Sequence, residues 1–235
     1  VIGRRMLEQT ARRHDLRVVS AWDVDAGVCM RTRADFPDLD VAADAAAAIA
    51  APGVDIVYVG TPPGVHRQYA LMAAQRGRKV FCEKPLSTDL ERARELVQLV
   101  EASGVPNAVG LVLRSSPALL TMRELISDPT SGRVMNVVFR DDQYLPTQGM
   151  YGSTWRGDRT LAGSGTLLEH SIHDVDILEW LVGPAVSVSA QQAFFHGLYI
   201  FYFLTTARGR TLRLGGKGGS GGVNAAVAWF VATLI

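Results

Sequence analysis

The chain has 235 residues, of which 48% are hydrophobic, enough to form the core of one large domain or two small ones. Its 24 basic and 23 acidic side chains give a formal net charge of +1, which provides no electrostatic reason to expect a nucleic-acid partner. No apolar run reaches the roughly 18 residues that a membrane-spanning helix needs, so we expect no membrane association.

Strand-like and helical patterns alternate through the first half of the chain. The spacing of apolar residues predicts helices over residues 4–14, 42–51, 65–76 and 88–103, and strands over residues 17–22, 55–59, 79–82 and 107–113. Thr88 with Glu91 three residues later has the form of a capping box, which predicts that Thr88 caps its helix. Strands that alternate with helices favour a parallel sheet with crossover connections, an α/β fold that is doubly wound.

The pattern changes near residues 114–117, where we place a boundary between domains 1–114 and 115–235. The second part reads as an α+β domain, with helices over residues 117–126 and 166–182, a polar loop over 144–163, and strands over 132–143, 186–195 and 198–205.

Both ends of the chain are unusual. The chain begins Val1-Ile2-Gly3 without an initiator Met, and residues 215–222 have the glycine-rich composition of a flexible linker. The apolar segment after that linker has no obvious partner strand. We therefore expect a chain that is truncated or aberrant at both ends, with an incomplete second sheet and poor activity by itself.

Gly3 and Asp23 match part of a dinucleotide-binding fingerprint. Gly3 opens a helix, and Asp23 ends the following strand twenty positions later, as the third glycine and the ribose-binding acid of that fingerprint do. The alternative is a helix-start glycine and a solvated strand-end carboxylate. If Asp23 binds the ribose, its charge would repel a 2′-phosphate, so we favour NAD, with NADP possible.

Two further strands end in polar residues. Thr61-Pro62-Pro63 follows the strand at 55–59, and Glu83-Lys84-Pro85 follows the strand at 79–82. Ligands of doubly wound domains bind beyond the carboxyl ends of strands, so these residues are candidates for cofactor contacts and, for Lys84, chemistry. His66 starts the next helix, either near the cofactor or as an exposed first-turn residue.

A third cluster lies downstream on the helix predicted at 166–182. Glu169, His173 and Asp176 have helical spacing and would share one stripe. An imidazole with an ordinary pKa can act as a base near neutral pH, and a carboxylate beside it would fix its tautomer. The alternative is a solvated helix face.

The three clusters in this order resemble the Gfo/Idh/MocA oxidoreductases. The motifs that carry the resemblance are Thr61-Pro62-Pro63-x-x-His66, Glu83-Lys84-Pro85 and Gly163-x-Gly165-x-x-x-Glu169-x-x-x-His173-x-x-Asp176, and the likeness extends from Val1 to about Ser189. The resemblance implies a Rossmann domain followed by a domain with an open, mostly antiparallel sheet. It implies hydride transfer between NAD(P) and a secondary alcohol of a sugar or polyol.

The same resemblance implies roles for individual residues. Lys84 and His173 match the catalytic lysine and histidine, while Glu169 stands where many members have Asp. We expect Gly3, Asp23, Thr61, Pro62, His66, Glu83 and Lys84 to bind the cofactor, and Asp176 to bind the substrate. From their place in the loop before the predicted helix, we expect Trp155 and Arg156 to bind the substrate too, although Arg156 could instead contact the cofactor or pair with Asp158. A homo-oligomer is implied for the full-length protein.

The sequence also allows other functions. The only two cysteines, Cys29 and Cys82, lie outside any CxxC motif, which gives no zinc or disulfide framework and fits a reducing cytoplasm. His170, His173 and Asp174 could form part of a metal site, but zinc prefers three or four converging ligands and we expect none. A non-catalytic regulator that binds dinucleotide or sugar, or an inactive fragment, are the alternatives to an enzyme.

Overall fold

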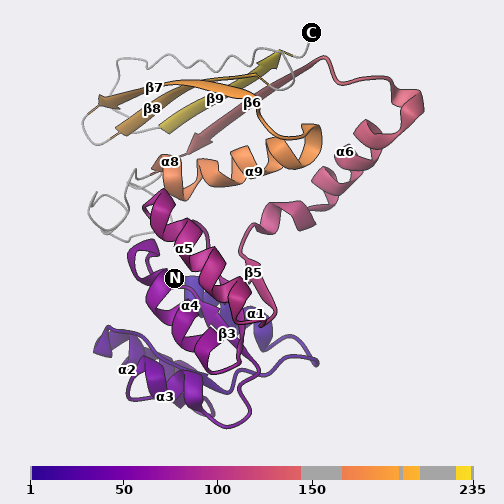
Figure 1. Ribbon diagram of the computed structural model, residues 1–235. Helices are drawn as coiled ribbons and strands as arrows, with labels where there is room; N and C mark the ends of the chain where they lie inside the picture. Colours follow the sequence, from indigo (N-terminus) through magenta and orange to yellow (C-terminus); the bar gives the residue numbers. More distant parts are fainter. Residues whose placement is uncertain (1, 144–165, 196–197, 207–225, 234–235) are drawn as a thin grey trace. The chain divides into compact units, whose positions relative to one another are not determined.

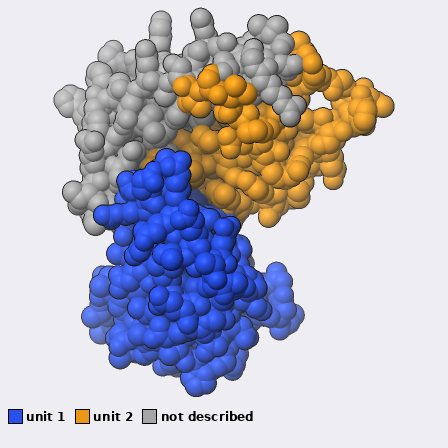
Figure 2. All heavy atoms as spheres, viewed as in Figure 1, with its two compact units in different colours: residues 1–110 blue, residues 111–235 orange. Residues whose placement is uncertain are grey.

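The chain forms two compact units, residues 1–110 and 111–235, which Figure 2 distinguishes by colour. The computed structural model describes residues 2–143, 166–195, 198–206 and 226–233. No helix in this described part is both long and apolar enough to cross a membrane.

Unit 1 contains two parallel sheets. In the smaller one, β1 (Ser20–Ala21) pairs with β2 (Asp40–Val41). The larger one has the order β3-β4-β5, formed by Ile56–Val59, Lys79–Cys82 and Asn107–Val109. In its register Val59 pairs with Cys82, and Cys82 with Val109, so the three strands end level with one another.

The described part of unit 1 has five α-helices (Figure 1): α1 (Ile2–Thr10), α2 (Ala26–Asp35), α3 (Ala45–Ala50), α4 (His66–Gln75) and α5 (Leu90–Ala102). The helix α1 precedes β1, and the other four connect successive strands. The predicted strand β4 has the bounds expected, and α4 and α5 lie where the apolar spacing indicated. The helix α2 was not predicted, because only Cys29 is buried along it and its sequence has no apolar stripe. Its start is marked by Asp25, whose side chain accepts hydrogen bonds from the Gly27 and Val28 amides.

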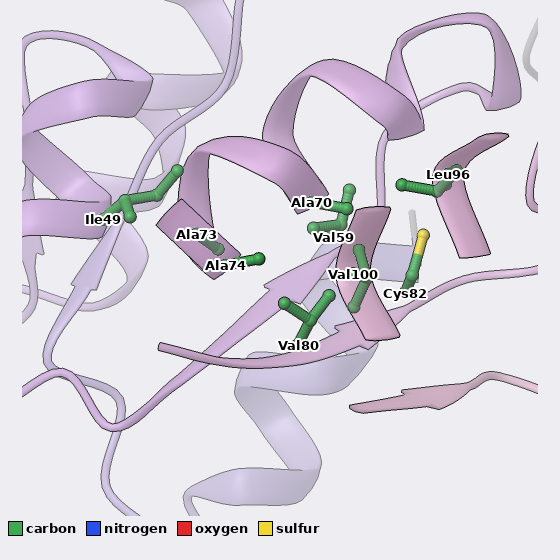
Figure 3. Close-up of a cluster of buried hydrophobic side chains, with 9 residues drawn as sticks. All are labelled: Ile49, Val59, Ala70, Ala73, Ala74, Val80, Cys82, Leu96 and Val100. Carbon is green, nitrogen blue, oxygen red and sulfur yellow. The ribbon is translucent and has the colours of Figure 1, made fainter. Parts of the chain in front are cut away.

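The core of unit 1 lies between the larger sheet and the helices that pack on it (Figure 3). From α4, Ala70, Ala73 and Ala74 face the strand residues Val59 and Val80. Alanine side chains are small, so the helix backbone can approach the sheet closely. The remaining members of this cluster are Ile49, Cys82, Leu96 and Val100. Packing of this helix against β3 and β4 therefore fixes where the loops at the strand ends begin.

Unit 2 is an α+β unit with a four-stranded sheet. Its helices are α6 (Pro117–Ser127), α8 (Thr166–Glu169) and α9 (Ser171–Val182), with short 3₁₀ turns at Val112–Ser115 and Pro129–Ser131. Its strands are β6 (Asn136–Gln143), β7 (Ser187–Phe195), β8 (Leu198–Thr206) and β9 (Ala226–Thr233) in the order β6-β9-β8-β7. Only the β8–β9 pair is parallel, so the sheet is mostly antiparallel, as expected.

Three expectations for unit 2 are wrong. The apolar segment near the end of the chain does have partners, because β9 lies between β6 and β8 and pairs with both. The helix predicted over 166–182 is interrupted at His170, which separates α8 from α9. The strand predicted from residue 132 begins only at Asn136, after Gly132 with φ of +79° ends a turn. The polar loop predicted over 144–163 lies outside the described residues.

The cap of α5 also differs from the prediction. Asp89, not Thr88, has the extended backbone of a capping residue, and its Oδ1 accepts a hydrogen bond of 2.9 Å from the Arg92 amide. The sequence contains two adjacent residues that can each cap a helix. Because the helix starts at Leu90, only Asp89 is placed to bond its first turn.

This difference gives a direct test. Asp89→Ala should lower the free energy of unfolding by about 1 kcal/mol, because it leaves an amide at the start of α5 without its acceptor. Thr88→Ala is the matched control and should change stability by less than about 0.5 kcal/mol. Urea unfolding followed by circular dichroism measures both. A larger loss for Thr88→Ala than for Asp89→Ala would restore the original assignment.

Candidate active site

The candidate site in unit 1 lies at the edge where β3, β4 and β5 end together. Backbone hydrogen bonds continue past the strands there, from the Glu83 amide to the Val59 carbonyl at 2.9 Å and from the Gly110 amide to the Cys82 carbonyl at 2.8 Å. The residues that follow the strands are therefore held side by side. Carboxyl ends of parallel strands are where doubly wound domains bind their ligands.

Glu83 is held by its neighbours at this edge. The Tyr58 hydroxyl donates a hydrogen bond of 2.9 Å to Glu83 Oε1, and the Lys84 amide donates to Oε2 at 3.3 Å. Burial, and then the negative charge of Glu83, raise the pKa of Tyr58 above its ordinary value, so the phenol remains a hydrogen-bond donor at neutral pH. Tyr58 was not singled out from the sequence, because it reads there only as one residue of an apolar strand.

His66 joins the two polar loops. Its side chain is fully buried, and its ring nitrogens lie 2.8 Å from the Pro85 carbonyl oxygen and 2.7 Å from the Thr61 carbonyl oxygen. Carbonyl oxygens only accept, so a neutral ring donates to one of them and a protonated ring donates to both. The alternative of an exposed first-turn histidine is wrong. His66 instead connects the loop after β3 to the Lys84–Pro85 segment after β4, whose peptide bond is cis.

The helical cluster of unit 2 is buried. Glu169 at the end of α8 is 6% exposed and His173 on α9 is 9% exposed, so the alternative of a solvated face is wrong for these two residues. Asp174, which we considered only as a metal ligand, is also buried. A single continuous helix is not observed, because the helix is interrupted at His170, between Glu169 and His173.

Asp176 has a partner in unit 2. Both of its carboxylate oxygens accept hydrogen bonds from the Arg114 guanidinium, with Nε at 2.9 Å from Oδ2. This ion pair raises the pKa of Arg114. Arg114 thus links the turn at Val112–Ser115 to α9. Trp155 and Arg156, the other predicted substrate contacts, lie outside the described residues.

The described residues contain no cluster of three or more His, Cys, Asp or Glu side chains that could hold a metal ion. The His170 and His173 rings lie edge to face, with their centroids 6.3 Å apart.

Comparison with known proteins identifies the family. Residues 1–111 match the GFO/IDH/MocA oxidoreductase family with its NAD-binding Rossmann fold, and residues 119–216 match the GFO/IDH/MocA C-terminal domain. The chain belongs to this family. Both the family suggested by the motifs and the α/β fold class are thereby confirmed.

Named relatives of this GFO/IDH/MocA protein support the assignment. It is 37% identical over 140 residues to 1,5-anhydro-D-fructose reductase of Ensifer adhaerens, covering 59% of this chain and 41% of that protein. It is 28% identical over 173 residues to inositol 2-dehydrogenase 2 of Saccharopolyspora erythraea, covering 72% of this chain and 47% of that one. The chain therefore spans less than half the length of these relatives.

A solved structure shows the same fold. The crystal structure of GenD2 from gentamicin A biosynthesis, in complex with NAD, superimposes with a TM-score of 0.79 at 20% identity. The superposition covers 97% of this chain and 69% of that one.

The residues of the GFO/IDH/MocA Rossmann domain fit the expected NAD cofactor in part. The Thr61 hydroxyl oxygen is buried and has no hydrogen-bond partner among the described residues, so a polar ligand group at the end of β3 could satisfy it. Asp23 is exposed, and its Oδ1 accepts a hydrogen bond from the Asp25 amide at 2.9 Å.

Gly3 fits the dinucleotide-binding fingerprint less well. A Cβ added there would meet no described atom within 4 Å, so the close packing expected of a fingerprint's third glycine is not observed.

The two ring contacts of His66 lead to a prediction. His66→Ala should lower the free energy of unfolding by about 2–4 kcal/mol, because it removes a buried side chain and the hydrogen bonding that its ring provides to the Thr61 and Pro85 carbonyl groups. It should also weaken NADH binding, since the loops after β3 and β4 lose their connection. Urea unfolding and NADH fluorescence titration measure these effects. The exposed His14→Ala is the control and should change neither; equal effects of both substitutions would contradict the argument.

Cys82 leads to a pH-dependent prediction. Burial, and then the charge of Glu83, raise the pKa of its thiol from 9.0 to about 12. Between these two pH values the unfolded chain loses the proton while the folded chain keeps it, so the thiol's contribution to stability falls as pH rises.

The stability deficit of Cys82→Ala, measured by urea unfolding, should therefore shrink from pH 9 to pH 11. Val80→Ala on the same strand is the control, because it removes no titrating group. A deficit for Cys82→Ala that stays constant over this range would contradict the raised pKa.

Proposed function

We propose that the full-length protein transfers a hydride between a secondary alcohol of a sugar or polyol and NAD. The observation that carries the proposal is the position of Lys84, directly beyond the carboxyl end of β4 in an NAD-binding Rossmann domain. Bound NAD would accept the hydride during oxidation and NADH would return it during reduction.

In this proposal Lys84 acts on the reacting oxygen. An ammonium group within hydrogen-bond distance of a substrate hydroxyl favours its alkoxide character, which the loss of a hydride requires. Lys84 is half-buried, and its backbone is held by the Glu83 carboxylate and by the bond from His66 to Pro85. Such support limits the positions that the start of the side chain can adopt.

His173 would take the proton from the substrate hydroxyl as the hydride leaves. Its burial supports this role, because burial limits contact of the imidazole with bulk solvent. Glu169, buried at the end of the preceding helix, would fix the tautomer of the imidazole and stabilise its protonated form.

We propose Trp155 and Arg156 as substrate contacts only on their sequence position, ahead of the helix that carries His173. Asp176 is different, because both of its oxygens bond to Arg114. Its ion pair supports a role in holding α9, the helix that carries His173, rather than in contacting the substrate.

The names of the relatives refer to an anhydro sugar and to inositol, which supports a sugar or inositol-like substrate. We also propose a homo-oligomer. A cytoplasmic location is consistent with the two buried cysteines, neither of which is in a disulfide.

Substitution of the two catalytic candidates tests the proposal. In the full-length protein, Lys84→Met and His173→Ala should each lower kcat by about 10²–10⁴-fold, because each removes a group that acts on the reacting hydroxyl. NADH affinity should stay within about threefold of the wild type. Steady-state kinetics with a panel of polyols and NADH fluorescence titration give both values.

The control variants replace a lysine and a histidine outside the proposed site. Lys79→Met changes a lysine at the opposite, amino end of β4, and His14→Ala removes an exposed histidine; both should retain wild-type turnover. Normal turnover in both Lys84→Met and His173→Ala would refute the mechanism. Tight NADH binding by the wild type with no reaction on any polyol would instead favour the non-catalytic regulator.

A further inference from the structure

We propose that Tyr58 is a positioning residue for the Glu83-Lys84 segment, which it holds through a hydrogen bond from β3 to the Glu83 carboxylate. The inference rests on the proposed function for its effect on turnover. It is carried by the contacts of Tyr58 and Glu83 with three adjacent strands.

The Tyr58 ring is held in place on two sides. It stacks on Phe81 of the neighbouring strand β4, with the ring centroids 5.7 Å apart and the ring planes inclined by 26°. It also passes over Gly60, where an added Cβ would lie only 2.7 Å from the ring atom Cε1. A larger residue at position 60 would displace the ring. The direction of the Tyr58 hydroxyl is therefore set by packing before it forms its hydrogen bond.

The Glu83 carboxylate is bounded on the opposite side by β5. A Cβ added at Gly110 would lie 2.8 Å from Glu83 Oε2 and 3.0 Å from its carboxyl carbon. The absence of a side chain at Gly110 leaves room for the carboxylate at this point. Glu83 thus lies between the hydroxyl from β3 and the bare backbone that follows β5.

We call the hydrogen bond from the Tyr58 hydroxyl to the Glu83 carboxylate the tether. Burial, and then the Glu83 charge, keep the pKa of Tyr58 above its ordinary value, so the hydroxyl remains a donor over the pH range in which dehydrogenases are assayed. Hydrogen bonds to charged groups are roughly twice as strong as bonds between neutral groups. The tether fixes one oxygen of Glu83, and the Lys84 amide bonds the other.

Lys84 is directly affected by this arrangement. Its backbone amide bonds to the carboxylate that Tyr58 holds, so loss of the tether allows Glu83 and the start of the Lys84 side chain to move together. Turnover depends on the position of the lysine ammonium relative to the reacting oxygen, and small displacements of a catalytic group lower kcat more than they alter cofactor affinity.

Tyr58→Phe in the full-length protein is the principal test. It keeps the ring that packs on Phe81 and removes only the hydroxyl. We expect kcat to fall about tenfold, in line with loss of a hydrogen bond to a charged group, while KM for NAD changes less than about threefold. In a Glu83→Ala background the same substitution should have no further effect on kcat, because the acceptor is already absent.

Gly110→Ala provides a second, independent variant. It displaces the Glu83 carboxylate from the other side without altering Tyr58, and it should lower kcat to a similar extent. Tyr69→Phe is the control, since Tyr69 lies on α4 of the same unit and contacts Trp22 rather than the site. Wild-type kcat in Tyr58→Phe, or an equal loss in the presence and absence of Glu83, would overturn the proposal.

A readout that needs no turnover separates this inference from the proposed function. The labelling rate of Lys84 by an amine-reactive reagent, measured by peptide mass spectrometry against Lys79 in the same chain, should change more than threefold in Tyr58→Phe. An unchanged ratio would overturn the positioning role. If the wild type is inactive on every polyol and Tyr58→Phe still changes the labelling rate of Lys84, the proposed function is refuted and the positioning role is retained.

Discussion

The level ending of β3, β4 and β5 is the constraint on which the rest of unit 1 depends. The register places Val59, Cys82 and Val109 opposite one another, and two further backbone hydrogen bonds hold Glu83 and Gly110 beside the strand ends. A slip of one residue in a strand would turn its side chains to the other face of the sheet. The contacts of Glu83 with Tyr58 and its space at Gly110 exist only in this register.

Two side chains join the segments that follow β3 and β4 at this edge of the sheet. His66 connects the loops that follow β3 and β4 through their carbonyl groups, and Tyr58 connects the same two segments through the Glu83 carboxylate. Both connections are made by buried or half-buried groups, which reduces competition from bulk water for their hydrogen bonds. The segment that carries Lys84 is consequently held at two points rather than projecting as a free loop.

The sequence predicts the parts of this structure whose signals are local. The strand at Lys79–Cys82 is recognisable because an apolar run ends at Glu83-Lys84-Pro85, and α4 follows from its apolar spacing. Signals that depend on packing were missed. The helix α2 has no apolar stripe, and the choice between Thr88 and Asp89 as a cap depends on where the helix starts in space.

In the candidate site, too, local features were predictable from the sequence and features that depend on packing were not. Lys84, His66, Glu169 and His173 could be selected from motif spacing, but their burial could not, because it depends on segments distant in the sequence. The acceptors of His66 are 5 and 19 residues away, and the acceptor of Tyr58 is 25 residues away. Neither Tyr58 nor Gly110 carries a motif, and only the register of the sheet shows that both approach Glu83.

The ion pair between Arg114 and Asp176 has a mechanical consequence for unit 2. Arg114 lies four residues after the division at Gly110, in the first turn of the second unit, and Asp176 lies three residues after His173. Two hydrogen bonds from Arg114 therefore join the turn at Val112–Ser115 to α9, the helix that carries His173. A displacement of this turn would therefore act directly on the helix that carries the imidazole of His173.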